Sequence, residues 1–245
     1  MSLPPRCSVL ILDLGDVLLT WSPVTTTSIS PKMLKSIHSS TIWQQYERGR
    51  FSEDECYRLC GQRFSVDAEE LRRALVEARA SLRSNDAFIY LIHDLQAENP
   101  QLRVIGMSNI SAPDYAYTCT SPAMAGITFE RVFTSADAGM RKPDLCFFQY
   151  VLAEIGAQPS EVVFVDNDSE NVLAAQSLGM NALVFDDRDV RSVRQSLRSF
   201  TGDPVSRGLK FLEARAGQLD SETDGGQVVA ENFSQLLIWE ATNKR

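Results

Sequence analysis

Residues 9–21 read VLILDLGDVLLTW, an apolar run that meets an acid at Asp13 and then turns. Gly15 follows two residues after Asp13, and a second acid, Asp16, comes directly after it. A carboxylate at the end of a buried strand is costly unless it is paired or has a chemical role. The residues that fold beside Asp13 therefore decide whether it is a nucleophile, a metal ligand or a turn former.

Similar runs recur along the chain and predict the strands of one sheet. Their near-continuous Val, Ile, Leu and Phe content is typical of central strands that are covered on both faces. The expected strands are 8–14, 102–109, 161–168 and 181–187, with a weaker one at 131–135. Helical patterns at 143–156 and 169–178 separate the later strands. Strand–helix–strand alternation predicts an α/β fold with a doubly wound parallel sheet, of the Rossmann type.

The segment between the first two strong strands contains no convincing strand. Its helical patterns cover 31–47, 52–63, 67–83 and 85–97. So much helix inserted after the first strand predicts a small helical cap over the carboxyl edge of the sheet. We therefore expect a core formed by residues 1–16 and 100–200, a helical cap at 17–99, and a C-terminal helical extension at 201–245.

Composition excludes several classes of partner. The net charge of −8 argues against nucleic acid and anionic membranes as partners. No run is long enough to span a bilayer, and no secretory signal is evident, so we expect a cytoplasmic protein. Five scattered cysteines suit a reducing compartment. Cys56 and Cys60 lie one helical turn apart but lack further ligands for zinc, and we interpret them as two half-buried thiols.

The residues that follow the strands are the candidates for chemistry, because open parallel sheets bind ligands outside the carboxyl ends of their strands. They include carboxylates, a hydroxyl, an amide and a lysine, which together suit Mg²⁺ and a phosphate group. Asp13 could attack phosphorus to form an aspartyl-phosphate, while Ser108 and Lys142 neutralise the transferred group. The candidates are Asp13, Gly15, Asp16, Ser108, Asn109, Arg141, Lys142, Asp166, Asn167 and Asp168.

Each member alone also has a structural interpretation. An acid after a strand is often only a turn residue or a helix cap, and a lone lysine is most often a solvated charge. Asp186 and Asp187 also end a strand, and we interpret them as a polar turn. The combination is informative only if the strand order brings the strand ends together.

Four motifs in order resemble those of the haloacid dehalogenase-like (HAD) superfamily over residues 8–190. DLGDVL resembles the first motif, in which the leading acid, here Asp13, is the nucleophile. MSN resembles the second, with Ser108 binding phosphate, and RKPD the third, with Lys142. VFVDNDSENVLAAQSLGM is similar to the fourth, with Asp166 as a metal ligand. The resemblance implies the cap as well, with YERGRFSEDE at 46–55 as part of it.

The chain departs from the phosphatases of this superfamily at two positions. They carry a second Asp two residues after the nucleophile, where this chain has Gly15. General acid–base help of this kind is typically worth ~10²–10⁴ in rate. Asp16 could substitute for it, while Asn167 replaces the second acid of the fourth motif. The resemblance then implies a Mg²⁺ site of Asp13, Gly15 (through its carbonyl), Asp166 and Asn167.

The remaining site residues, Ser108, Asn109 and Lys142, would hold the phosphoryl group. Three functions stay open. They are a Mg²⁺-dependent phosphohydrolase acting through an aspartyl-phosphate, a non-hydrolytic HAD-like domain, and a metal-independent 2-haloacid dehalogenase, which Asp166 does not favour.

A narrower resemblance bears on the substrate. The chain resembles the N-terminal HAD-like part of fungal drimane-type sesquiterpene cyclases, with 201–245 similar to the junction and first helices of their cyclase domain. Their protonating motif, Asp-x-Asp-Thr-Thr, is absent here. The resemblance implies an isoprenoid diphosphate as substrate, and a terpene cyclase domain or protein as a partner for a non-hydrolytic chain.

Overall fold

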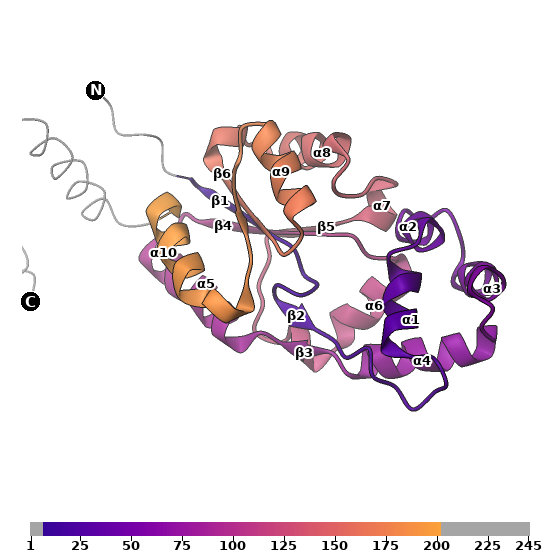
Figure 1. Cartoon of the computed structure of the whole chain (residues 1–245). Coiled ribbons are helices and arrows are strands. Elements are labelled where there is room, and N and C mark those ends of the chain that lie inside the picture. Colours follow the sequence, from indigo (N-terminus) through magenta and orange to yellow (C-terminus); the bar gives the residue numbers. More distant parts are fainter. Residues whose placement is uncertain (1–6, 202–245) are drawn as a thin grey trace, which may run out of the picture. The chain divides into compact units, whose positions relative to one another are not determined.

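The computed structural model describes residues 7–201, which form a parallel sheet flanked by helices together with a helical cap (Figure 1). The predicted extension at 201–245 lies, apart from Thr201, outside the described residues. No helix in the described part of the chain is long and apolar enough to cross a membrane. The expectation of a cytoplasmic protein stays a prediction.

The sheet confirms the predicted α/β fold. Its order is β5-β4-β1-β6-β7, and every neighbouring pair is parallel. The strands are β1 (Val9–Leu12), β4 (Arg103–Ser108), β5 (Arg131–Thr134), β6 (Val162–Asp166) and β7 (Asn181–Val184). Because β1 lies between β4 and β6, the residues that follow these three strands meet at one edge of the sheet.

Side chains of β1 alternate between two hydrophobic layers, as the pleat of a strand requires. Leu10 and Leu12 pack in the layer that contains α5 (Asp86–Glu98) and α10 (Val190–Thr201). Val9 and Ile11 pack in the opposite layer with α8 (Leu145–Ile155) and α9 (Ser169–Ser177). Figure 1 shows these two helix pairs on opposite faces of the sheet. The sheet is thereby covered on both sides.

The cap has a hydrophobic cluster of its own. It consists of α1 (Pro31–His38), α2 (Thr41–Glu47), α3 (Glu53–Phe64) and α4 (Ala68–Ala80). The sequence predicted one helix at 31–47, but Ser40 caps a second helix there with its side chain. An antiparallel ribbon of β2 (Leu19–Thr20) and β3 (Arg83–Ser84) joins the cap to the core.

Two expectations about the cap need correction. The helix expected at 85–97, α5, packs on the sheet with Phe88 and Leu91 instead of in the cap cluster, so the cap is shorter than 17–99. Cys56 and Cys60 are fully buried in the cap cluster, not half-buried, because both lie on the inner face of α3.

The remaining elements are short, and most lie at the edge of the sheet that carries the site or connect its strands. They are α6 (Ala112–Thr120), α7 (Ser135–Ala138) and three turns of 3₁₀ helix, η1 (Pro122–Met124), η2 (Pro159–Glu161) and η3 (Asp187–Asp189). Neither α6 nor α10 was predicted. Asp186 caps η3 with its side chain, which agrees with a polar turn at that position.

Candidate active site

Asp13 lies at the carboxyl end of β1, at the edge of the sheet. Its backbone N–H donates to the carbonyl of Val165 at 2.9 Å, which continues the pairing of β1 with β6. Its Oδ1 accepts from the Leu14 N–H at 2.8 Å and from Lys142 Nζ at 2.9 Å. Within residues 7–201, Oδ2 has no hydrogen-bond partner, and the side chain is 13% exposed. One oxygen is thus held in place while the other is open to a reactant.

Lys142 is the buried cation that joins the strand ends. Its side chain is 1% exposed, and Nζ donates to the Met107 carbonyl at 2.8 Å and to Asp166 Oδ2 at 2.6 Å. Burial by itself lowers the pKa of Lys142, but the charges of Asp13 and Asp166 raise it by a larger amount, so the net shift is upward. The ammonium stays charged. Burial raises the pKa of Asp13 to about 6, because loss of solvent outweighs the attraction of Lys142.

Asp166 is fully buried, and the described chain supplies donors to both of its oxygens. Oδ1 accepts from the Asp168 N–H at 2.8 Å and from Asn171 Nδ2 at 3.1 Å. Oδ2 accepts from Lys142 at 2.6 Å and from Asn171 at 3.1 Å. A metal bond to Asp166 would have to displace one of these donors. In the described chain Asp166 thus anchors Lys142, and Asn171, which was not predicted, orients Asp166. The predicted role of Asp166 as a metal ligand stays a prediction.

Asn109 positions the loop that carries Lys142. Its Nδ2 donates to the Lys142 carbonyl at 2.9 Å, and its Oδ1 accepts from the Lys142 N–H at 2.8 Å. One N–H of the amide remains for a ligand. Ser108 ends β4 and is 4% exposed, and its hydroxyl has no hydrogen-bond partner among the described residues. The predicted phosphate contacts of Ser108 and Asn109 stay predictions that this geometry permits.

Gly15 and Asp16 follow each other in the loop after Asp13. An added Cβ at Gly15 would meet no atom within 4 Å, so the structure has room for a side chain at this position. Asp16 as a whole residue is exposed and has a φ of 55°. Partial loss of solvent around its carboxyl raises its pKa, while the charge of Lys35 lowers it and that of Asp187 raises it. No hydrogen bond or ion pair in the described chain joins the Asp16 carboxylate to Lys142. The suggested substitution by Asp16 stays a prediction.

The donor set at the sheet edge has the chemistry that Mg²⁺ prefers. Residues 7–201 contain no group of three or more His, Cys, Asp or Glu that could hold a metal. The open Asp13 Oδ2, the Gly15 carbonyl and the exposed Asn167 after β6 are all oxygen donors of the predicted set. Mg²⁺ commonly binds through one or two carboxylates together with waters and substrate phosphate. The residues therefore fit Mg²⁺, with Asp13 as the carboxylate ligand.

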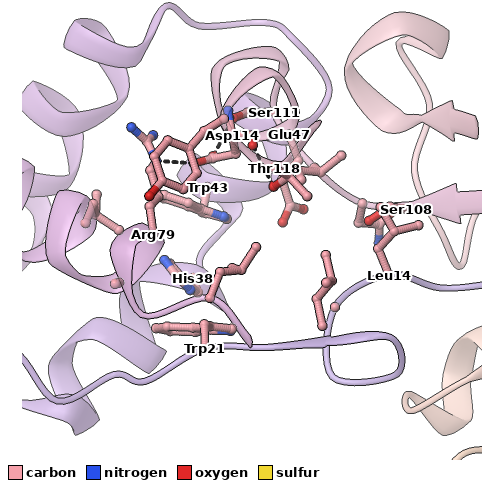
Figure 2. Close-up of a pocket in the computed structure, with 18 residues that line it drawn as sticks. Leu14, Trp21, His38, Trp43, Glu47, Arg79, Ser108, Ser111, Asp114 and Thr118 are labelled. Carbon is pink, nitrogen blue, oxygen red and sulfur yellow. Dashed lines mark hydrogen bonds and ion pairs between the residues drawn. The ribbon is translucent and has the colours of Figure 1, made fainter. Parts of the chain in front are cut away.

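A cavity of about 220 Å³ opens between the site and the cap. Its core end includes Gly15, Ser108 and Asn109, and its remaining wall is largely apolar, with Leu19, Leu75, Ala78, Leu82 and Ile110 (Figure 2). A molecule in this cavity would thus contact polar groups at its core end and mostly hydrocarbon along the remaining wall.

Three rings line the cap side of this cavity (Figure 2). The ring of His38 lies between Trp21 and Trp43, at centroid distances of 4.9 and 4.3 Å. Its Nε2 is buried without a hydrogen-bond partner in the described chain. Burial lowers the pKa of His38 to about 4, so the imidazole is neutral near neutral pH. This aromatic wall was missed, because the three rings are adjacent only once the cap has folded.

Ion pairs join the cap to the core around the cavity. Arg141 contacts Glu47 Oε2 at 3.1 Å, and Arg79 contacts Asp114 at 2.6 Å. Arg141 was a candidate from the RKPD motif, and its side chain binds Glu47 of the cap. Burial raises the pKa of Glu47 to about 7, although Arg141 lowers it. Glu47 was part of the quoted YERGRFSEDE segment but was not singled out.

Comparisons of sequence and of structure identify relatives of this chain. The sesquiterpene phosphatase astK of Aspergillus oryzae is 36% identical over 177 residues, which are 72% of this chain and 89% of astK. A predicted HAD-like hydrolase from Porphyromonas gingivalis superposes with a TM-score of 0.59 at 23% identity, covering 79% of this chain and 99% of that one. The chain belongs to the HAD-like superfamily.

Within this superfamily, the resemblance to fungal sesquiterpene enzymes is confirmed. The drimenol cyclase drtB of Aspergillus calidoustus is 44% identical over 234 residues, which are 95% of this chain and 44% of drtB. The chain thus spans less than half the length of that relative. Residues 205–245 match the family described as the sesquiterpene cyclase astC-like C-terminal domain.

Other HAD-like structures show the same fold. A HAD-family enzyme of Bacteroides thetaiotaomicron, solved as a magnesium complex, has a TM-score of 0.57 at 20% identity and covers 74% of this chain and 94% of that one. The L-2-haloacid dehalogenase of Xanthobacter autotrophicus has a TM-score of 0.54 at 14% identity, covering 82% and 86%. At such identities the likeness shows the fold alone.

Proposed function

We propose that this HAD-like chain is a Mg²⁺-dependent phosphohydrolase for a phosphate or diphosphate ester of an isoprenoid alcohol. One observation carries the proposal. Lys142, 1% exposed, holds Asp13 Oδ1, while Asp13 Oδ2 has no partner in the described chain. A carboxylate fixed in this way is placed to attack phosphorus and form an aspartyl-phosphate. The sesquiterpene phosphatase astK, which shares 36% identity, supports the reaction class.

The neighbouring residues suit a bound phosphoryl group. The hydroxyl of Ser108 and the ammonium of Lys142 would stabilise the oxygens that gain negative charge during transfer. Mg²⁺, held by Asp13, the Gly15 carbonyl and Asn167, would supply further positive charge beside those oxygens. Asp166 would keep Lys142 in position and charged.

The cavity supports an isoprenoid substrate. Its walls contain Leu19, Leu75 and Leu82 together with Trp21 and Trp43. Burying hydrocarbon against such walls is favourable by about 25 cal/mol per Å² of apolar surface. The names of both Aspergillus relatives refer to sesquiterpenes or a product of that class, which supports the same substrate class.

The alternative is a non-hydrolytic HAD-like domain that belongs to, or partners, a terpene cyclase. The match of 205–245 to an astC-like C-terminal domain favours it, as does the alignment of 95% of this chain with less than half of drtB. The dehalogenase hypothesis gains nothing specific, since its structural likeness shows only the fold.

Phosphate release from prenyl monophosphates and diphosphates, with Mg²⁺ or with EDTA, tests the proposal. We expect Mg²⁺-dependent release by the wild type and its loss in Asp13→Asn, because an amide cannot form the aspartyl-phosphate. Asp54→Asn is the matched control, since that side chain is 84% exposed on the cap. No release by the wild type would favour the non-hydrolytic domain, and release unchanged in Asp13→Asn would exclude the covalent mechanism.

A further inference from the structure

Glu47 places a carboxyl group from the cap in the cavity that Gly15 and Ser108 also line. It is the last residue of α2 and lines the cavity together with Gly15 and Ser108 (Figure 2). Its side chain is 13% exposed, and its Oε2 contacts Arg141. Its Oε1 has no hydrogen-bond partner in the part of the chain that the structure describes. One oxygen of Glu47 is thus held, and the other is available to a molecule in the cavity.

Loops next to the proposed site contact both the backbone carbonyl and the side chain of Glu47. Ser135 Oγ donates to the Glu47 carbonyl at 2.7 Å and accepts from the Ile110 N–H at 2.9 Å, two residues beyond Ser108. Arg141, which holds the side chain, is the neighbour of Lys142. The position of Glu47 is therefore coupled to the same two loops that would hold the phosphoryl group, although Glu47 belongs to the cap.

The other titratable groups of the cavity are less suited to proton transfer. Asp114 already accepts from Arg79 at 2.6 Å and from the Ser111 hydroxyl. His38 has a pKa lowered by burial to about 4, so it has no proton to give near neutral pH. Glu47 remains, and the cap contributes it to the cavity. In-line displacement puts the leaving oxygen opposite the attacking Asp13, so the acid that protonates it has to come from outside the strand that carries Asp13.

We propose that Glu47 is the general acid and base of this site and takes the role that the Gly15 position has lost. The inference rests on the proposed phosphohydrolase function and extends it to monophosphate esters with alkyl leaving groups. In the first step Asp13 forms a bond to phosphorus, the ester P–O bond breaks, and the leaving alkoxide takes the Glu47 proton. The products are the alcohol and the aspartyl-phosphate, with Glu47 ionised.

The second step returns Asp13 and Glu47 to their starting protonation states. Glu47 takes a proton from a water molecule while the water oxygen bonds to phosphorus. The bond between phosphorus and Asp13 breaks, which releases inorganic phosphate and regenerates the Asp13 carboxylate and the Glu47 acid. A diphosphate, whose leaving group is itself a phosphate, needs the first proton much less.

The electrostatics of the cavity suit this double role. Burial raises the pKa of Glu47 to about 7, Arg141 lowers it, and the nearby charges of Asp114 and Asp13 raise it. A group with a pKa near the working pH can both give and take a proton. The first step with an alkyl phosphate should therefore slow as the pH rises above about 7.

Rapid-quench measurement of the phosphoenzyme in Glu47→Gln tests the role, with farnesyl phosphate and p-nitrophenyl phosphate as substrates. With the alkyl ester we expect the rate of phosphoenzyme formation to drop by ~10²–10⁴. That rate should also no longer decrease as the pH rises above 7. With the aryl ester, whose leaving group needs no proton, the burst of p-nitrophenol should persist. The phosphoenzyme should then accumulate, because the second step lacks its base.

Arg48→Gln is the matched control, since it breaks a second ion pair between cap and core, Arg48–Asp144 at 2.7 Å, away from the cavity. It should change both steps by less than about twofold. Equal losses of both steps on both substrates in Glu47→Gln would assign Glu47 a purely structural role and overturn the inference. Wild-type rates in Glu47→Gln would overturn the inference alone, whereas absence of any phosphoenzyme in the wild type would overturn the proposed function too.

Discussion

At the scale of single residues, Gly15 explains most about this site. The sheet edge keeps the carboxylate and the lysine that the proposed phosphate site requires, but it lacks a side chain two residues after Asp13. The backbone at Gly15 does not require glycine, because an added Cβ would meet no atom within 4 Å and the residue is not among those with positive φ. The absence of an acid there is a chemical property of the chain and no steric necessity.

Gly15→Asp should therefore fold and supply an acid at the core end of the cavity. We expect it to leave the free energy of unfolding within about 1 kcal/mol of the wild type, as for ordinary surface substitutions. In a Glu47→Gln background it should restore at least about tenfold of the lost turnover on alkyl phosphates, part of the range that general acids provide. Steady-state phosphate release checks this. No recovery in a folded double variant would show that an acid at position 15 does not reach the leaving group.

A second prediction at this scale concerns Lys142 and the free energy of unfolding. Lys142→Met would leave Asp13 and the fully buried Asp166 without their shared cation. Removing one partner of a buried ion pair typically costs about 3–5 kcal/mol, since the remaining charge stays buried and unpaired. Urea unfolding at pH 7 measures the loss. Lys32→Met, at an exposed cap position, is the control and should lose less than about 0.5 kcal/mol. Similar losses in both variants would contradict the role of Lys142 as the centre of the site.

At the scale of elements, ion pairs between particular helices hold the cap on the core. Arg79 of α4 contacts Glu53 of α3 at 2.5 Å and Asp114 of α6 at 2.6 Å, and it donates to the Tyr57 hydroxyl at 3.0 Å. Glu53 and Tyr57 lie on α3, the helix before α4, whereas Asp114 lies on α6, beyond β4. Arg79 thus connects two cap helices to the core helix that follows β4.

Arg79→Met should cost about 2 kcal/mol of unfolding free energy, because hydrogen bonds to charged groups contribute about 1.5–3 kcal/mol each and partial solvation reduces the loss. Arg58→Met is the matched control. It breaks a pair with Glu55 within one helix, with both side chains about half exposed, and should cost less than about 0.5 kcal/mol. Chemical denaturation of both variants decides the matter. A loss for Arg79→Met no larger than that of the control would mean that these pairs do not hold the cap.

Elements also show where sequence reasoning succeeds and where it ends. The strands β1, β4 and β6 were predictable because both faces are buried, which gives unbroken apolar runs with polar residues directly after them. The ribbon of β2 and β3 has two residues in each strand, too few for any periodic pattern. The helix α5 has the composition of a cap helix in sequence, and only its contacts with the sheet show that it belongs to the core.

At the scale of the whole molecule, some residues of the candidate site could be predicted from the sequence, and others come together only in the folded structure. Asp13, Ser108, Lys142 and Asp166 were predictable, because parallel topology brings their strand ends and the RKPD loop to one edge. Glu47 was not, since its place in the cavity depends on how the cap packs. The cap therefore adds the proposed general acid, which the motifs do not encode.

Burial of Glu47 has a consequence for the stability of the whole chain. Its pKa is raised from 4.5 to about 7 in the folded state, so the folded state favours the neutral carboxyl. Below pH 4.5 the group is neutral in both states, and no cost arises. As the pH rises toward 7 the unfolded chain releases the proton first, and stability is lost. One pKa unit corresponds to about 1.4 kcal/mol. The shift therefore lowers the free energy of unfolding by about 3 kcal/mol once the pH exceeds 7.

Glu47→Gln should remove this dependence. We expect the free energy of unfolding of the wild type to fall by up to about 3 kcal/mol between pH 4.5 and 7.5 relative to that of Glu47→Gln, because the glutamine carries no proton to release. Glu69→Gln, at a side chain 75% exposed, removes a carboxylate of α4 and should keep the wild-type profile. Urea titrations at several pH values compare the three proteins. Parallel profiles for the wild type and Glu47→Gln would show that Glu47 ionises as easily in the folded chain as in water, which would also remove the electrostatic support for its role in proton transfer.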